Sequence, residues 1–192
     1  MSLVDEALSA PAVVVSVMGP HAGEDSSTIF GRKMKDCETV ERTFWVAKSP
    51  KARPAQVQEI CRSGQGFVLF IEPASPGGAR PTTESDSAVE YSPDRVAWFP
   101  LPNGLGPVTG QMDASATALV FDRIVVDVDR AIDLWAYADF ANPDVPLRFA
   151  LGLSTAIALH KDTSEHPRRM KSRYRRLVAV ARLADPYCVW LR

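Results

Sequence analysis

Short apolar runs bounded by glycine or proline dominate the pattern of hydrophobic and polar positions along this chain. The run 67–71 holds five apolar residues and is bounded by Gly66 and Pro73, and the run 43–47 is rich in aromatic and β-branched residues. Runs of this length and composition predict strands, and an unbroken apolar run predicts a strand buried on both faces. The stretch 42–73 therefore predicts strand, short helix and strand, and the rest of the chain is expected to pack around it.

Strands are predicted at many places and helices at few. Pro54 suits the first turn of a helix over 54–62, and its apolar residues share one face. Residues 1–10 are frayed or form a short helix, and 131–140 could form another. Further strands are predicted at 12–18, 96–99, 117–128 and 147–151 (with a helix over 146–160 as a competitor), and as a hairpin of 177–181 and 187–191 around 184–186. This inventory predicts an α+β fold: a curled mixed β-sheet or a small β-barrel with a few short flanking helices.

Length and composition predict one soluble domain spanning residues 1–192, since 192 residues with 46% hydrophobic and 23% charged content are ordinary for such a domain. The polar, Gly- and Pro-containing stretches 19–42 and 74–95 predict long surface loops. No apolar run approaches the roughly 20 residues of a membrane span, and no signal peptide is evident. Three widely spaced cysteines give no disulfide or zinc pattern, which favours a reducing, cytoplasmic setting. The sequence gives no indication of oligomeric state.

The densest charge in the chain lies in residues 168–176, which we call the basic segment. Six of its nine residues are cationic and none is acidic, so the rest of the chain carries a net charge of −7. Phosphates would neutralise this charge, and released counterions would add to the affinity. Five of the six cations are arginines, which suit planar recognition of phosphate, and the tyrosine could stack on an unpaired base. The predicted contact residues are Arg168, Arg169, Lys171, Arg173, Tyr174, Arg175 and Arg176.

Catalytic, cofactor and metal sites find little support in the sequence. The glycine-rich stretch 104–110 lacks the Lys-Ser/Thr ending of a phosphate-binding loop and predicts a tight turn. His160 and His166 match no familiar metal-ligand spacing, and no nucleophile elbow is present. Cys37, near Lys35, is the one thiol with an activating neighbourhood. The sequence therefore favours a protein without catalytic residues, cofactor or metal.

The two strands of the stretch 42–73 begin with recognisable motifs. The first is Phe44-Trp45-Val46-Ala47-Lys48-Ser49-Pro50, an aromatic pair followed by a Lys-Ser turn, and the second is Gly64-Gln65-Gly66-Phe67-Val68-Leu69-Phe70, a glycine and a polar residue before an apolar strand. Both resemble elements of EVE-type domains in the PUA-like superfamily. The resemblance implies a small β-barrel with flanking helices that binds RNA or modified DNA bases.

These observations favour a cytoplasmic, non-catalytic module that binds nucleic acid, either RNA or a modified DNA base. The basic segment would hold phosphates, and Trp45 or Trp98 would contact a base in a pocket completed by Lys48 and Ser49. One alternative is a small enzyme or binding protein for a phosphorylated or otherwise anionic metabolite. A second is an interaction domain that docks an acidic partner. In a further interpretation, the basic segment is a solvated face paired with the chain's own acidic residues in 84–94.

Overall fold

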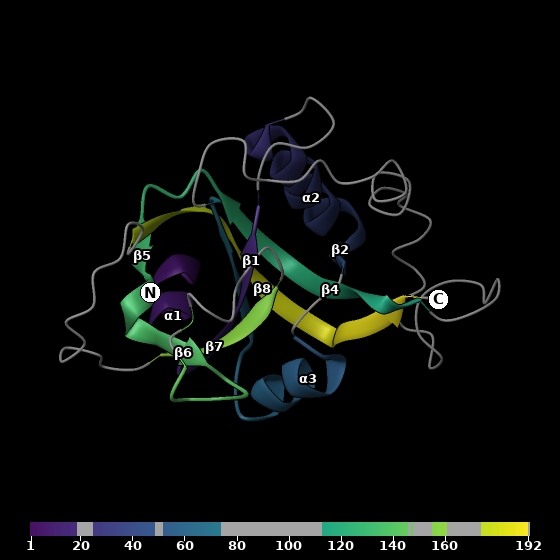
Figure 1. Ribbon diagram of the computed structural model, residues 1–192. Helices are drawn as coiled ribbons and strands as arrows, with labels where there is room; N and C mark the ends of the chain where they lie inside the picture. The colour runs from purple at the N-terminus through teal and green to yellow at the C-terminus, as the bar shows by residue number, and fades with distance from the viewer. Residues whose placement is uncertain are drawn as a thin grey trace.

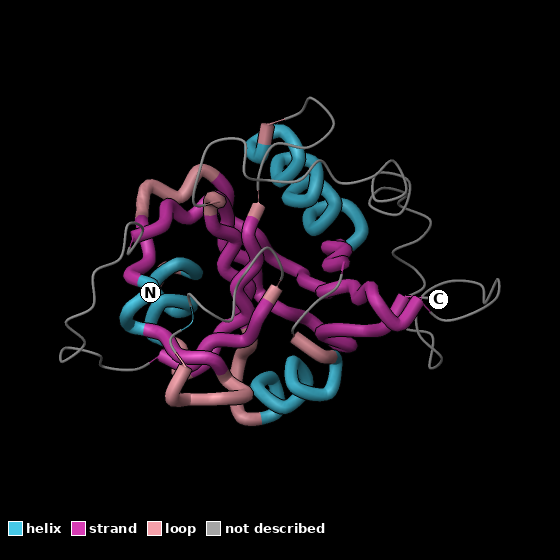
Figure 2. Tube along the Cα trace, in the orientation of Figure 1, coloured by secondary structure: helices cyan, strands magenta, loops and turns pink. Residues whose placement is uncertain are grey.

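The computed structural model describes residues 1–18, 25–48, 52–73, 113–145, 147, 155–160 and 174–191. These residues contain three α-helices, one 3-10 helix and eight strands (Figures 1 and 2). The helices are α1 (Leu3–Ser9), α2 (Ser26–Val40) and α3 (Pro54–Arg62), and the 3-10 helix is Leu134–Ala136. The strands are β1 (Ala12–Val17), β2 (Thr43–Lys48), β3 (Phe67–Ile71), β4 (Asp113–Val126), β5 (Ala131–Asp133), β6 (Tyr137–Asp139), β7 (Ala156–His160) and β8 (Tyr174–Leu191).

The strands that the structure describes form one mixed sheet that does not close into a barrel. Their order is β2-β4-β8-β3-β1-β7-β6, and β5 pairs with β8 beside this path. β1 and β3 are parallel, and the other pairs are antiparallel. The predicted α+β class is confirmed, and the architecture is the open mixed sheet.

β3 is buried on both faces, as its unbroken apolar run predicts. Phe67, Leu69 and Ile71 contribute to one core cluster, and Val68 and Phe70 contribute to the other. The first cluster also contains residues of α1, and the second contains residues of α2 and α3. The sheet is therefore a middle layer with α1 on one face and α2 and α3 on the other (Figure 1).

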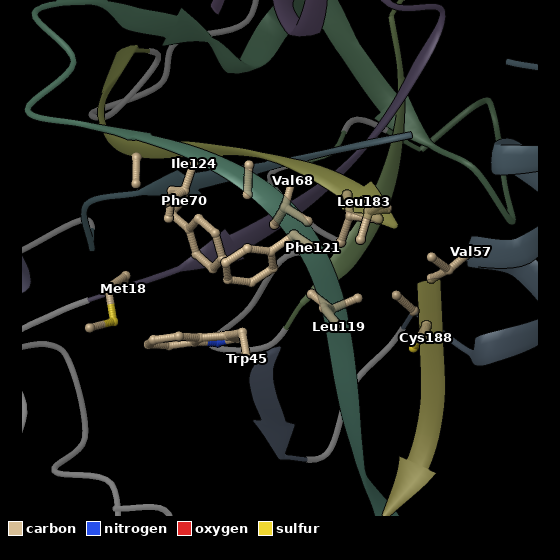
Figure 3. Packing of buried hydrophobic residues seen from close by; sticks show 14 of the residues in the cluster. Met18, Trp45, Val57, Val68, Phe70, Leu119, Phe121, Ile124, Leu183 and Cys188 are labelled. Carbon is tan, nitrogen blue, oxygen red and sulfur yellow. The ribbon is translucent and has the colours of Figure 1, made fainter. Parts of the chain in front are cut away.

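Aromatic rings fill the space between the sheet and α2. The Phe70 ring centroid lies 4.6 Å from that of Phe30 in α2, 5.3 Å from that of Trp45 in β2 and 6.2 Å from that of Phe121 in β4. Figure 3 shows three of these rings lying together on the same side of the sheet. Centroid separations of about 4.5–7 Å are favourable for aromatic pairs, so this cluster joins four elements.

Residues 26–40 form α2, so the predicted surface loop over 19–42 is wrong for most of its length. Asp25 caps the helix, because its Oδ1 accepts a hydrogen bond from the Thr28 N–H at 2.7 Å. Among the side chains that the structure describes in α2, the fully buried large apolar ones are Ile29 and Phe30, so its local pattern is weak and packing against the sheet decides its structure. The predicted loop over 74–95 lies outside the described residues.

β8 is one long strand, whereas the sequence predicts a hairpin of 177–181 and 187–191. Both halves pair with β4, and residues 184–187 bulge opposite Val120. The peptide bond before Pro186 is cis. The residues that predict a turn therefore form a bulge, because the chain continues along β4 instead of reversing its direction.

The predicted strand over 117–128 is confirmed as far as Val126, as part of β4. The register against β8 shifts at Asp122, which is an extra residue in β4. Both oxygens of its carboxylate accept hydrogen bonds from the Arg182 guanidinium, at 2.8 and 2.9 Å. Asp122 is thus both the bulged residue and one partner of a cross-strand ion pair.

Residues 131–140 form β5, the 3-10 helix and β6, so the predicted helix there is wrong. Ala131 pairs with Arg176, which lets β5 extend the line of β4 along β8. Pairing of β5 with β8 and of β6 with β7 outweighs the weak helical pattern of this segment. Strand β7 likewise contradicts a helix over 146–160, and α1 confirms the short N-terminal helix. The predicted strands 96–99 and 147–151 lie outside the described residues, apart from Leu147.

Replacing Phe70 by alanine is expected to lower the free energy of unfolding by about 3–5 kcal/mol, because it leaves a cavity among three rings. Phe70→Leu keeps more of the volume and should cost less. Denaturant unfolding of both variants measures the difference. A loss below about 1 kcal/mol for the alanine variant would contradict the packing described above.

Candidate nucleic-acid interface at the start of β8

The described part of the basic segment begins strand β8. Tyr174, Arg175 and Arg176 pair with the three residues of β5. The other predicted contacts, Arg168, Arg169, Lys171 and Arg173, lie outside the described residues. The structure therefore places one end of the segment on a strand, with a hydrogen-bonded partner that fixes its backbone.

Alternation along the strand separates these three side chains. Tyr174 and Arg176 are two residues apart and project to the same side, and Arg175 projects to the other. Tyr174 is 61% exposed, which makes it one of three exposed large apolar residues in the described chain. Arg175 is partly buried and its Nη1 donates to the Glu72 carbonyl oxygen at 3.3 Å. Burial lowers the pKa of its guanidinium.

Arg176 is paired with a carboxylate of the protein itself. Its Nε lies 2.9 Å from Glu72 Oε1, and the two side chains are 61% and 45% exposed. An ion pair this exposed contributes about 0–1 kcal/mol, because water and salt screen it. Glu72 thus neutralises one arginine of the segment weakly. The acidic residues 84–94, predicted as the alternative neutraliser, lie outside the described residues.

Several elements meet around the start of β8. The end of β3 and the residue before β5 lie beside it, because Glu72 N–H donates to the Arg176 carbonyl and Leu177 N–H donates to the Arg130 carbonyl. Arg130 Nη1 also lies 3.3 Å from Asp5 Oδ1 of α1. Backbone contacts therefore hold the basic residues here in fixed relative positions.

The N-terminus of α2 carries acidic rather than anion-binding character. The Asp25 carboxylate occupies the Thr28 N–H, and Ser27 Oγ donates to Asp127 Oδ1 at 2.7 Å. Two carboxylates near a helix N-terminus occupy the place that an anion would take. This arrangement weighs against a phosphorylated metabolite bound at the first turn of α2.

The predicted base pocket is wrong at Trp45. That side chain is 8% exposed and stacks on Phe30 at 5.3 Å, so it belongs to the core. Lys48 is the last residue of β2. Ser49 and Trp98 lie outside the described residues.

The three cysteines are unsuited to nucleophilic chemistry. Burial, followed by the carboxylates of Asp122 and Asp36, raises the pKa of the Cys37 thiol to about 12. Burial raises the pKa of Cys61 to about 11 and that of Cys188 to about 12. The predicted activation of Cys37 by Lys35 is therefore wrong, because desolvation and the two carboxylates exceed the lowering effect of the Lys33 charge on the pKa of this thiol. Within the described chain, no cluster of three metal-ligating side chains exists.

A buried charged group under α2 was missed by sequence reasoning. Lys33 is 3% exposed, its Nζ donates to the Phe44 carbonyl oxygen at 2.7 Å, and it lies 5.4 Å from the Trp45 ring centroid. Asp36, also buried, accepts a hydrogen bond from Thr43 Oγ1 at 3.3 Å. These contacts join α2 to β2. Helical spacing from Lys33 to Asp36 and Cys37 was the available signal, but the loop prediction hid it.

No family model, curated protein or solved structure matches this chain. Among the helices that the structure describes, none is long and apolar enough to cross a bilayer.

Replacing Asp36 by asparagine is expected to raise stability more at neutral pH than in acid. Burial raises the pKa of Asp36, although the Thr43 hydroxyl and the Lys33 charge oppose this. Its stabilising contribution is full below the unfolded-state pKa and is lost as pH rises through the folded-state value. The free energy of unfolding of the asparagine variant should therefore rise relative to that of the wild type between about pH 3 and pH 7. Urea unfolding across this range measures the difference.

Asp25→Asn is the control, with the opposite sign. The Thr28 backbone N–H lowers the pKa of Asp25, so the wild type gains stability from it as pH rises. The free energy of unfolding of Asp25→Asn should therefore fall relative to that of the wild type across the same pH range. If the stability of the two variants changed with pH in the same way, the opposite pKa shifts of Asp36 and Asp25 would be contradicted.

Proposed function

We propose that this protein is a non-catalytic nucleic-acid-binding module whose basic segment contacts phosphates. The observation that carries the proposal is the exposed Tyr174 ring on the same side of β8 as Arg176, at the end of a segment with six cations. An aromatic face beside cationic groups is the combination that binds single-stranded nucleic acid without strict sequence preference. RNA and modified DNA are both within this proposal.

The pairing of Arg176 with Glu72 is compatible with such binding. An exposed ion pair contributes about 0–1 kcal/mol, whereas a phosphate chain offers a charge to every cation of the segment at once. The nucleic acid would exchange one weak internal contact for several external ones. Glu72 then acts as an internal competitor that lowers affinity slightly.

The same proposal includes the family likeness and the cellular setting. The motifs at 44–50 and 64–70 lie largely on β2 and β3, and their resemblance to EVE-type domains supports a PUA-like module that binds nucleic acid. The free thiols of Cys37, Cys61 and Cys188 support a reducing, cytoplasmic location.

Wild-type protein is expected to bind a mixed-sequence single-stranded oligonucleotide with an affinity that falls steeply as salt rises. Tyr174→Leu should weaken binding by about 1–3 kcal/mol because it removes the stacking face, and Tyr174→Phe should keep it. Changing Arg173, Arg175 and Arg176 to alanine should flatten the salt dependence. Fluorescence anisotropy across a salt series measures each effect. Absence of salt-sensitive binding in the wild type would end the proposal.

Replacing Glu72 by glutamine should strengthen binding about twofold to fivefold, because it releases Arg176 from an exposed ion pair. The salt slope should steepen by about one phosphate contact. Glu59→Gln on α3 removes the same charge elsewhere and is the matched control. Equal effects of the two variants would show that net charge alone is responsible and would contradict a specific role for Glu72.

A further inference from the structure

Arg130 lies beside the basic segment in space, although the two are distant in the sequence. It is the residue before β5, and its carbonyl oxygen accepts a hydrogen bond from the Leu177 N–H at 2.8 Å. Ala131 pairs with Arg176, so Arg130 lies across from the first residue after the segment. Backbone contacts therefore hold a further arginine next to the proposed nucleic-acid interface.

The Arg130 side chain projects to the face of the sheet that α1 covers. Ile132, two residues along, and Leu177 belong to the core cluster that contains residues of α1. Arg130 Nη1 lies 3.3 Å from Oδ1 of Asp5 in α1 (Figure 1). Side chains alternate along a strand, so Arg176, which precedes Leu177, projects to the opposite face. The two exposed arginines thus lie on opposite faces of the sheet at the start of β8.

The ion pair with Asp5 leaves most of the Arg130 guanidinium available to a ligand. The two side chains are 55% and 45% exposed, so water and salt screen their attraction. The contact engages one nitrogen of a group that has five N–H donors. Asp5 does not depend on this contact, because its Oδ2 accepts a hydrogen bond from Ser2 Oγ at 2.6 Å in the cap of α1. A phosphate could therefore replace this carboxylate at little cost to the fold.

The carboxylates around these arginines offset part of their charge. Asp5 pairs with Arg130 and Glu72 pairs with Arg176, while Asp129 is next to Arg130 in the sequence and Asp133 pairs with Tyr174 across β5 and β8. Of these, Asp133 also accepts a hydrogen bond from the Trp135 N–H at 3.0 Å. The basic segment brings four more cations directly before Tyr174 in the sequence, with no acidic residue among them. Once these are included, the cations outnumber the four carboxylates, which favours an anionic ligand.

We propose that Arg130 is a further phosphate contact, and that the ligand of this interface is a single-stranded nucleic acid that contacts both faces of the sheet. This role rests on the proposed function and extends it to a residue outside the basic segment. A backbone that reaches cations on opposite faces of one strand must bend sharply, whereas duplex DNA is stiff over about 150 base pairs. A single strand also offers unpaired bases to the exposed Tyr174 ring.

The test is binding of the full chain to short fluorescent oligo(dT) and oligo(rU) strands, measured by anisotropy across a salt series. Arg130→Gln should lower the affinity about fivefold near 0.1 M salt and make the salt slope shallower by about 0.7, the value for one phosphate contact on a single strand. DNA and RNA share the phosphate and the unpaired base, so tighter binding of one strand assigns the natural source of the ligand.

Arg123→Gln is the matched control, because it removes the same charge from an exposed arginine of β4. Arg123 pairs with Arg182, six residues along β8 from Arg176. At about 3.3 Å per strand residue, it is roughly 20 Å from the start of β8. This variant should bind both strands like the wild type.

Two further variants separate a direct contact from a structural role. Arg130→Lys keeps the charge and should keep the salt slope of the wild type. Asp5→Asn removes the ion pair but keeps Arg130, so it should bind as tightly as the wild type or up to about twofold tighter. Circular dichroism checks that each variant is folded. If Asp5→Asn weakened binding as much as Arg130→Gln does, Arg130 would act through the fold, and the proposal would be overturned.

The remaining outcomes separate the role of Arg130 from the function on which it rests. Salt-sensitive binding by the wild type, with equal salt slopes for Arg130→Gln and Arg123→Gln, would overturn the role of Arg130 and leave the function intact. An oligo(dA)·oligo(dT) duplex bound as tightly as the single strand would overturn the single-stranded ligand. Absence of salt-sensitive binding in the wild type would end both proposals.

Discussion

Two-sided burial of the parallel pair β1 and β3 is the constraint on which the rest of the structure depends. Successive residues of both strands enter opposite core clusters, as Val13 and Val14 do in β1. A sheet that is apolar on both faces needs a cover on each, and α1 covers one face while α2 and α3 cover the other. The positions of all three helices follow from this requirement.

The cover over the second face also determines where charged groups are buried. α2 contributes Phe30 to the aromatic cluster, and the same helix carries Lys33 and Asp36 into the interior. Buried charges need hydrogen-bond partners, and β2 supplies the Phe44 carbonyl and the Thr43 hydroxyl. Packing thus comes first, and the polar contacts under α2 are a consequence of it.

Local pattern was sufficient where a segment's own residues decide its structure. The apolar run of β3 and the proline-started helix α3 needed no knowledge of their partners. The helix α2 and the single strand β8 were not predicted, because residues distant in sequence decide their structure. Packing against the sheet stabilises the weak helix α2, and pairing with β4 on both sides of Pro186 makes that region a bulge instead of a turn. Tertiary context overrides propensity in both cases.

The same distinction applies to the candidate interface. Exposure of Tyr174 follows from its place in a charged segment, which the sequence displays directly. Trp45 was misassigned because an aromatic side chain looks the same in a core and in a pocket until its neighbours are known. Glu72 was not predicted as the partner of Arg176, since only the pairing of β3 with β8 brings these distant residues together.

Topology places the carboxyl termini of α1 and α3 and the basic start of β8 at opposite ends of the parallel pair β1 and β3. α1 leads directly into β1 and α3 leads directly into β3, so both helices end at the amino ends of the parallel strands. Their carboxyl termini therefore add negative partial charge at one edge. β8 is antiparallel to β3, so its basic start must lie at the other edge. A parallel pair preceded by helices thus keeps the helix carboxyl termini away from the basic start of β8.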